Sequence, residues 1–443
     1  MNILELSEQE IVRRQSLQTL RDMGIDPYPA AEFPTNAFST DIKAEFNDDE
    51  EPRQVVIAGR LMGRRVMGKA SFAEIQDSKG RIQVYVARDE ICPDENKDLY
   101  NTVFKKLMDI GDFIGVKGFV FRTQTGEISV HAKEITMLSK SLKPLPIVKY
   151  KDGVAYDKFD DPELRYRQRY VDLVVNDGVK DTFLQRATVL RTLRRVLDEA
   201  GYTEVETPTL QSIAGGASAR PFITHFNALN QDMYMRIATE LYLKRLIVGG
   251  FEGVYEIGKN FRNEGMDRNH NPEFTCMELY VQYKDYNWMM SFTEKLLETV
   301  CIAVNGSTER KIGDNVISFK APYRRLPILD AIKEKTGYDL NGMSEDEIRE
   351  VCKKLEMEID DTMGKGKLID EIFGEFCEGT FIQPTFITDY PVEMSPLTKM
   401  HRSKPGLTER FELMVNGKEL ANAYSELNDP IDQEERFIDQ MKL

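Results

Sequence analysis

The last part of the sequence carries two acidic residues at a spacing that could hold a metal ion. An Asn-Gly pair at 416–417 is a strong turn signal and predicts a hairpin over residues 409–427. With this two-residue turn, Glu412 lies opposite Ala421, and Glu412 and Glu419 lie diagonally on one face. Two carboxylates this close repel each other unless a cation lies between them. Their oxygens suit Mg²⁺, which completes its ligand set with waters and nucleotide phosphates.

Three more residues with polar groups follow on the second strand of this hairpin: Asn422, Tyr424 and Glu426. They share one face, but strict alternation places that face opposite to the side chain of Glu419. If these residues join the same pocket, a β-bulge must occur between Glu419 and Asn422.

A second polar strand face occurs within a strand, loop and strand predicted over residues 253–283. Alternation along its second strand places four side chains together on one face, namely Phe274, Cys276, Glu278 and Tyr280. The preceding loop adds Arg262, Glu264 and His270. An aromatic ring, an acid and a phenol form a poor core, so this face could be a pocket floor. A solvated sheet surface with salt bridges explains the pattern equally well.

A third candidate surface lies nearer the N-terminus, where two short strands alternate. Phe72, Glu74 and Gln76 face outward on one strand, and Gln83 faces outward on the next. An aromatic ring beside an amide suits the stacking of an unpaired base and the reading of its edge. A single exposed phenylalanine covered by the N-terminal helix is the alternative, and this segment alone favours that alternative.

The elements that must position these residues fall into two regions. Apolar spacing predicts a helix over residues 11–23 that ends at Gly24. Five short alternating strands between residues 54 and 137 then predict a small barrel.

The second region begins after the Pro-containing segment 143–146 and mixes helices with strands. We expect a charged helical stretch over 161–170, a helix ending at Gly201, a strand over 202–208 and a helix over 240–248. Residues 327–379 read as helices and resemble an insertion.

Composition limits the class of protein. The chain has 443 residues, and its 59 basic and 74 acidic residues give a net charge of -15. This charge argues against a general nucleic-acid coat and leaves room for a local basic face. No stretch approaches the roughly 18 apolar residues of a spanning helix, so we expect no membrane partner. The acidic start does not fit a signal peptide and predicts a cytoplasmic protein. Five scattered cysteines make a disulfide framework and a zinc site poor expectations.

Several segments resemble one enzyme family. FRNEG and HNPEFTCMELY resemble motif 2 of class II aminoacyl-tRNA synthetases, and GYTEVETP resembles motif 1. GGASARPF, IATELYLKRL and NAYSELNDP are similar to segments of the lysyl-tRNA synthetases of the bacterial type. The resemblance implies an α+β protein: residues 1–145 form an N-terminal helix and an OB-fold barrel that binds the anticodon. Residues 146–443 form a class II catalytic domain, an antiparallel β-sheet flanked by helices, and the enzyme works as a homodimer.

The resemblance also implies roles for single residues. Arg262 and Glu264 are the implied catalytic residues, with Arg262 holding the substrate carboxylate and the α-phosphate of ATP. The implied ATP contacts are completed by His270, Asn271 and Phe274, and Glu412 and Glu419 would bind Mg²⁺. The α-amino group of lysine would bind Gly216 and Glu240, and its side chain would lie among Glu278, Tyr280, Asn422, Tyr424 and Glu426. The implied anticodon contacts are Arg64, Phe72, Gln83 and Glu127.

The implied activity is the ATP-dependent ligation of L-lysine to tRNA(Lys). In the family a third motif, a glycine-rich strand and helix with an arginine that contacts ATP, follows NAYSELNDP, whereas this sequence ends at FIDQMKL. We expect a weakened ATP site for that reason. Two alternatives remain: an aspartyl or asparaginyl enzyme, which would need a cation facing the substrate side chain, and a non-catalytic tRNA-binding or regulatory protein.

Overall fold

The computed structural model describes residues 6–146, 148–151, 154–156, 158–217, 219–267 and 269–440. Ser218 of the GGASARPF segment therefore lies outside the described residues. The chain divides into two units, Met1–Lys180 and Asp181–Leu443. Each unit has its own hydrophobic core, so each is described by itself. The predicted functional domains, 1–145 and 146–443, stay predictions.

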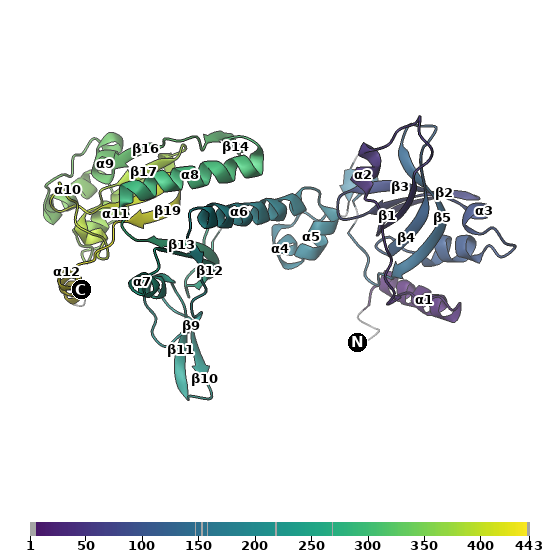
Figure 1. Ribbon diagram of the computed structural model, residues 1–443, viewed down its shortest axis with the longest axis horizontal. Coiled ribbons are helices and arrows are strands. Elements are labelled where there is room, and N and C mark those ends of the chain that lie inside the picture. The colour runs from purple at the N-terminus through teal and green to yellow at the C-terminus, as the bar shows by residue number, and fades with distance from the viewer. Residues whose placement is uncertain are drawn as a thin grey trace. The chain divides into compact units, whose positions relative to one another are not determined.

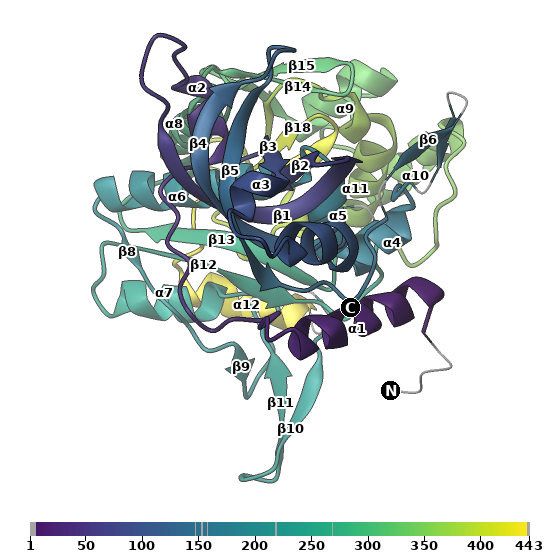
Figure 2. The same ribbon diagram turned by 90° about the vertical axis from the view of Figure 1, so that its right-hand side faces the viewer.

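The first unit is built on a closed barrel with the strand order β1-β2-β3-β5-β4 (Figure 2). Its strands are β1 (Gln54–Met67), β2 (Ala70–Gln76), β3 (Arg81–Ala87), β4 (Phe113–Arg122) and β5 (Ile128–Ser139). The barrel core consists of alternate residues such as Ile75, Val84 and Val116, as the period of two predicts. The predicted small barrel is confirmed. One element that the sequence analysis did not predict, the helical segment η2 (Leu99–Leu107), lies between β3 and β4.

Helices complete this unit. The N-terminal helix α1 (Glu8–Asp22) begins with a capping box between Ser7 and Glu10, and Gly24 follows it with a φ of 73°. This confirms the first predicted helix. The charged stretch forms two helices rather than one, because the backbone at Gln168 leaves the helical region. The remaining elements are α2 (Ser39–Ala44), α3 (Arg88–Ile91), β6 (Lys149–Lys151), β7 (Val154–Tyr156), α4 (Pro162–Arg167) and α5 (Arg169–Val175).

The second unit contains a four-stranded sheet with the order β16-β17-β18-β19. Its strands are β16 (Arg324–Pro327), β17 (Thr385–Thr388), β18 (Arg410–Val415) and β19 (Lys418–Tyr424). Helix α8 (Tyr286–Asn305) packs on one face of this sheet (Figure 1), where Met290 contacts a core that includes Phe386 and Phe411. The opposite face packs against α9 (Ile328–Thr336), α10 (Glu345–Lys354) and α11 (Lys365–Phe376). These helices fill the crossover between the parallel strands β16 and β17.

A three-stranded sheet with the order β13-β12-β8 carries the second polar face. Its strands are β8 (Thr203–Glu204), β12 (Gly253–Phe261) and β13 (Glu273–Val281), and α7 (Glu240–Val248) has the predicted bounds. The predicted strand over 202–208 is much shorter than expected. Pro208 has no N–H to donate, and Thr207 donates to the Glu256 carboxylate, with its backbone N at 3.2 Å and its Oγ1 at 2.6 Å.

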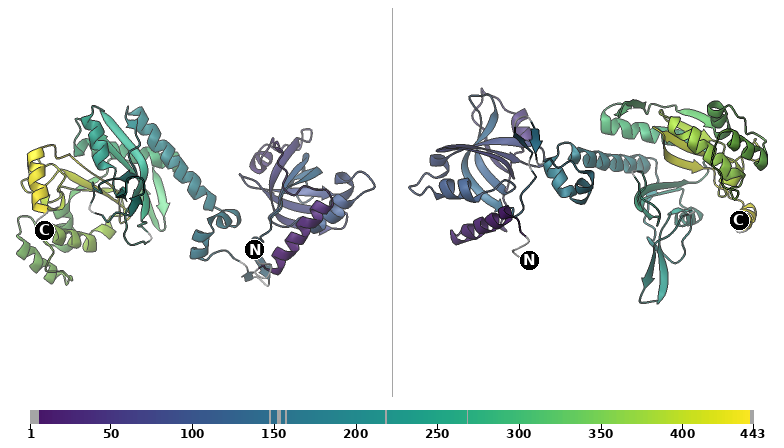
Figure 3. Two further views of the ribbon diagram at one scale, coloured as in Figure 1. Left: turned by 90° about the horizontal axis from the view of Figure 1, so that it is seen from below. Right: turned by 180° about the vertical axis from the view of Figure 1, so that it is seen from behind.

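The other elements lie around these sheets. Helix α6 (Val179–Glu199) ends before Gly201, as predicted, and the hairpin of β10 (Ile223–Phe226) and β11 (Gln231–Met235) projects from its unit (Figure 3). The remaining elements are β9 (Leu210–Gln211), β14 (Glu309–Ile312), β15 (Asn315–Ser318), η3 (Glu378–Thr380), η4 (Val392–Met394) and α12 (Pro430–Gln440). Among the described residues, no helix has the length and apolar character needed to cross a membrane.

Candidate functional site

The polar face of β13 lies where alternation predicted it. β12 and β13 pair from Gly253 with Val281 to Phe261 with Glu273, so Glu278 lies opposite Glu256 and Cys276 opposite Gly258. Burial, followed by the charge of Glu278, raises the pKa of the Cys276 thiol to about 11. The predicted grouping on one strand face is therefore confirmed, and the side chains of this face are half-buried.

A buried ion pair lies directly beside this face. Arg236 Nη1 contacts Glu256 Oε1 at 2.5 Å, and both side chains are almost fully buried. Arg236 also donates from Nε to the carbonyl of Lys259 at 2.7 Å and from Nη1 to the carbonyl of Thr207 at 3.1 Å. A Cβ at Gly258 would lie 2.3 Å from Arg236 Nη2, so only glycine leaves room for the guanidinium. The ion pair between Arg236 and Glu256 therefore holds the backbone of β12 in place just before Arg262.

The final hairpin contains the bulge that a single pocket requires. Glu419 lies opposite Met414 and Ala421 lies opposite Leu413, so Leu420 is the extra residue. Glu412 consequently lies opposite Asn422, and the predicted pairing of Glu412 with Ala421 is wrong. The predicted bulge between Glu419 and Asn422 is confirmed. It turns Glu412, Glu419, Asn422 and Tyr424 to one face of the sheet.

Several predicted lysine contacts lie close together. Gly216 has a φ of 88°, and a Cβ at this position would lie 3.3 Å from the Cβ of Glu240. The Thr239 N–H points to Glu278 Oε1 at 3.4 Å, and the Tyr280 hydroxyl donates to Glu278 Oε2 at 3.3 Å. These contacts join the glycine-containing loop, the start of α7 and the floor strand β13.

The charges of three acids meet at two phenols. Burial first, and then the carboxylates of Glu240, Glu278 and Glu426, raise the pKa of Tyr280 well above its usual range. The same three acids and burial raise the pKa of Tyr424. Both phenols therefore stay protonated and can donate hydrogen bonds. The predicted lysine contacts thus include acids from α7, β13 and the end of β19 that lie close together.

The acids expected to bind Mg²⁺ also influence each other. Burial first, and then the charge of Glu412, raise the pKa of Glu419 to about 7, with a smaller contribution from Glu378. Glu412 forms an ion pair with Arg410, whose Nε also donates to Asn422 Oδ1 at 3.3 Å. The pKa of Glu419 stays raised although the charges of Arg410 and Arg262 oppose the shift, which fits a site for a divalent cation. In the described part of the chain no three acidic, histidine or cysteine side chains gather as a metal site, so waters and phosphates would supply the other ligands.

Arg262 is placed to receive a ligand. Its guanidinium carbon lies 5.2 Å from the ring centroid of Phe274, and its Nε is buried without a partner among the described residues. A buried unpaired donor is costly unless a ligand or water completes it. The Arg262 charge also opposes the upward pKa shifts of Cys276 and Glu419, so the guanidinium lies near both side chains.

The loop between β12 and β13 holds the remaining predicted nucleotide contacts. His270 Nδ1 lies 2.8 Å from Asp267 Oδ2, and Asn271 Nδ2 donates to the carbonyl of Glu273 at 2.7 Å. Glu264 Oε1 accepts from the backbone N of Arg220 at 3.3 Å. These side chains are exposed. His270 and Asn271 bond within a few residues, whereas Glu264 bonds to a distant segment of the chain. Lys418 Nζ reaches Asn269 Oδ1 at 2.5 Å, which ties this loop to the tip of the final hairpin.

The barrel carries the predicted anticodon residues. The rings of Phe72 and Tyr85 lie 5.2 Å apart on neighbouring strands, and Gln83 Oε1 accepts from Ser129 Oγ at 2.8 Å. Glu127 forms an exposed ion pair with Lys43 at 3.2 Å. Arg64 donates to the carbonyls of Phe104 and Met108, so its guanidinium is turned to η2.

An aromatic row extends this surface around the barrel, and sequence reasoning missed it. Tyr85 lies opposite His131, and His131 lies opposite Phe119, with ring centroids 5.0 and 4.8 Å apart. The alternation of residues along β4 and β5 indicates this row of rings. Sequence reasoning also missed Lys244, Arg410 and Glu378 as neighbours of the predicted site residues, although Lys244 stands four residues after Glu240 in a predicted helix.

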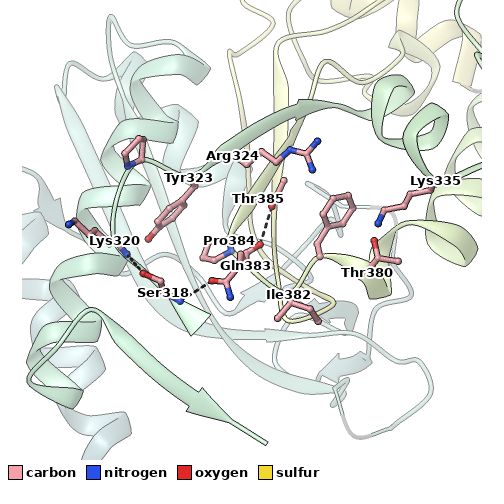
Figure 4. A pocket seen from close by; sticks show the side chains of 12 residues that line it. Ser318, Lys320, Tyr323, Arg324, Lys335, Thr380, Ile382, Gln383, Pro384 and Thr385 are labelled. Carbon is pink, nitrogen blue, oxygen red and sulfur yellow. Dashed lines mark hydrogen bonds between the residues drawn. The ribbon is translucent and has the colours of Figure 1, made fainter. Parts of the chain in front are cut away.

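One cavity lies apart from these residues. It has a volume of about 480 Å³, and Tyr323, Arg324, Lys335, Phe381 and Gln383 are among its lining residues (Figure 4). None of the predicted site residues lines it. The site is thus a polar, open surface of the sheets rather than this cavity.

Known proteins resemble the chain over its full length. Residues 55–138 match the family described as OB-fold nucleic acid binding domain, and residues 161–443 match tRNA synthetases class II (D, K and N). The lysine-tRNA ligase of Porphyromonas gingivalis is 68% identical over 445 residues, which cover 100% of this chain and 77% of that protein. The lysine-tRNA ligase of Azobacteroides pseudotrichonymphae is 64% identical over 438 residues, 99% of this chain and 88% of that protein. The chain therefore belongs to the lysine-tRNA ligases within the class II tRNA synthetases.

Proposed function

We propose that this chain activates L-lysine with ATP and transfers the lysyl group to tRNA(Lys). The observation that carries the proposal is the gathering of Glu240, Glu278 and Glu426 around Tyr280 and Tyr424. A substrate with an ammonium side chain needs such acids, whereas aspartate or asparagine would need an available cation in the same place. The cation that lies there, Lys244, is already paired with Glu240 and Glu426. The acids therefore support lysine over the other substrates of this class.

The activation step needs positioning and charge stabilisation rather than a dedicated base. Gly216 and Glu240 bind the α-amino group, and Arg262 holds the lysine carboxylate beside the α-phosphate. A carboxylate oxygen then attacks the α-phosphorus in line, and pyrophosphate leaves. In the second step the terminal ribose hydroxyl of the tRNA attacks the carbonyl carbon of lysyl-adenylate, and AMP leaves.

In this proposal the nucleotide lies along β13 and the loop that precedes it. Phe274 stacks on adenine, while Glu264, His270 and Asn271 lie along the nucleotide. Glu412 and Glu419 hold Mg²⁺, which when bound neutralises charge on the phosphates. Asn422 completes the surroundings of the lysine side chain.

The proposal also covers the recognition of tRNA and the oligomeric state. Residues 1–145 read the anticodon through Arg64, Phe72, Gln83 and Glu127, and residues 146–443 carry the catalytic site. The aromatic ring of Phe72 beside the Gln83 amide supports base stacking with edge recognition. We also propose a homodimer that works in the cytoplasm.

The test is ATP-pyrophosphate exchange with each of three amino acids. Lysine should stimulate exchange, and aspartate and asparagine should not. Arg262→Ala should abolish the lysine-dependent signal, whereas Arg324→Ala, at an exposed ion pair with Glu334, should retain it. Equal stimulation by all three amino acids would contradict the assigned substrate. Charging of tRNA(Lys) then tests the second step.

A further inference from the structure

Lys244 lies inside the acidic pocket although nothing in the proposed reaction uses it. Its Nζ donates to Glu240 Oε1 at 2.6 Å and lies 2.8 Å from Glu426 Oε2. Glu240 belongs to the same helix, but Glu426 follows β19, so the contact joins two separate walls of the pocket. The Lys244 side chain is 29% exposed, less than an ordinary surface lysine.

The two acids that Lys244 joins are expected to bind the two different amino groups of the substrate. Burial disfavours the charged form of Lys244, yet Glu426 and Glu240 raise the pKa of its ammonium above the usual value. Lys244 in turn counteracts the upward shift that burial causes in the pKa of Glu426. The ammonium is therefore an internal cation held between carboxylates from two walls of the pocket.

The charges around the pocket can be compared with those of the substrate. The acids Glu240, Glu278 and Glu426 and the cations Lys244 and Arg262 leave one negative charge. Lysine carries two ammonium groups and one carboxylate, so its net charge is one positive. Among these five groups, the net charge matches that of the substrate only when Lys244 is included.

Arg410 does not change this comparison. It is the other cation near Tyr424, but it forms an ion pair with Glu412, two residues further along the same strand. Without Lys244, the other four groups would carry two negative charges, one more than lysine neutralises. A diamine without a carboxylate would fit that charge better than lysine does.

We propose that Lys244 is a specificity-determining residue that sets the charge of the pocket and so favours lysine over diamines of the same length. The inference rests on the proposed function, because it assigns Glu240 and Glu426 to the amino groups of lysine. It adds that a residue of α7 disfavours binding of the decarboxylated substrate. Lys244 acts through the two acids and the field in the pocket.

The test compares lysine with 1,5-diaminopentane as ligands of the intact chain. Dissociation constants for both are measured by calorimetry, and the diamine is also assayed as a competitor of lysine-dependent exchange. In Lys244→Met the ratio of the diamine constant to the lysine constant should fall by about tenfold or more, as expected for one charge several ångströms away in a partly solvated pocket. Lys244→Arg should keep the ratio of the unchanged protein.

Controls separate this inference from the proposed function. Lys333→Met removes an exposed lysine that pairs with Asp339 at 2.7 Å, and it should leave the ratio unchanged. Lys244→Gln is a second neutral variant that can still donate to the acids, and it decides the outcome if the methionine variant does not fold. A ratio that is unchanged in the neutral variants would overturn the role of Lys244. If the unchanged protein does not bind lysine, the proposed function fails instead.

Discussion

Glu426 is a carboxylate whose ionisation depends on its neighbours. Burial raises its pKa, and the ammonium of Lys244 opposes that shift. The same acid acts on Tyr280 and Tyr424, which come from two different strands. A substrate ammonium would therefore meet an acid that already contacts one ammonium and lies near two hydroxyl groups.

Glu426→Gln should weaken lysine binding much more than ATP binding. A buried ammonium that loses its charged partner costs about 3 kcal/mol or more, roughly a hundredfold in the dissociation constant. Calorimetry with lysine and with ATP measures both affinities. Glu350→Gln, at an exposed pair on α10, is the matched control. Equal losses for lysine and ATP would reject the assignment of Glu426.

Gly258→Ala should destabilise the second unit. The added Cβ would lie 2.3 Å from Arg236 Nη2 and would displace the guanidinium from Glu256. Breaking a buried ion pair by moving one partner costs about 3 to 5 kcal/mol. Urea unfolding followed by circular dichroism gives the difference in free energy of unfolding.

Gly265→Ala is the control for this substitution, because a Cβ at Gly265 meets nothing within 4 Å. It should leave the free energy of unfolding nearly unchanged. A stable Gly258→Ala protein would mean that the guanidinium can leave Glu256 at little cost.

At the scale of elements, the bulge at Leu420 decides which side chains share a face. Deletion of Leu420 should be tolerated, because it leaves Glu419 opposite Met414 and Asn422 opposite Glu412 in a regular ladder. Deletion of Ala423 should abolish lysine binding, because it turns Tyr424 and the residues after it to the other face. Calorimetry on both deletion variants tests this, and equal loss of binding would show that the bulge itself shapes the pocket.

The loop that precedes β18 depends on a buried acid. Glu409 accepts from Arg402 Nε at 2.5 Å and from Ser425 Oγ at 2.7 Å, and Ser425 Oγ accepts from the backbone N of Tyr286 on α8. The Arg402 hydrogen bond lowers the pKa of Glu409 below its usual value. Glu409 therefore stabilises the folded protein above its unfolded pKa, and this contribution is lost as the pH falls through the lower folded pKa.

Glu409→Gln should reduce the free energy of unfolding by about 2 kcal/mol at neutral pH, the usual value for hydrogen bonds to a charged group. The difference between the variant and the unchanged protein should shrink below about pH 4. Denaturant unfolding at several pH values measures this difference. A difference that stays constant down to acid pH would contradict the role of the Glu409 charge.

Local patterns were sufficient to predict most elements. The alternation of apolar and polar residues predicted the barrel strands and the polar face of β13. Helix α7 has the predicted bounds because apolar spacing indicates its buried face and Gly249 indicates its end. The sequence could predict the bulge only as a condition for a single pocket. Contacts between distant segments, such as Lys244 with Glu426 and Arg236 with Glu256, depend on how those segments pack together, which no local sequence pattern predicts. Strand 202–208 was overestimated because the buried Glu256 draws Thr207 away from the ladder.

At the scale of the whole molecule, the barrel and the catalytic unit have separate cores. A change on the barrel surface should therefore leave the lysine site intact. Phe72→Ala should weaken tRNA binding by about 1 to 3 kcal/mol, the usual value of one base stack, with lysine affinity unchanged. Filter binding with tRNA(Lys) and calorimetry with lysine test the two parts.

Phe113→Ala is a matched barrel variant, because Phe113 is an exposed ring on β4 with the Arg60 guanidinium 4.2 Å from its centroid. It should bind tRNA as the unchanged protein does. Unchanged tRNA affinity in Phe72→Ala would mean that Phe72 is a single exposed apolar side chain with no part in binding.

The raised pKa of Cys276 has a consequence for the chemical reactivity of the molecule. All five cysteines of the chain are free, and Cys276 lies on the polar face of β13, in the proposed lysine site, with a pKa raised to about 11. At pH 7 only about one molecule in ten thousand would carry the reactive thiolate there. Alkylating reagents and mild oxidants should therefore spare this position, and an electrophilic lysine analogue should gain no covalent bond from it. Burial, together with the charge of Glu278, thus protects this thiol from modification.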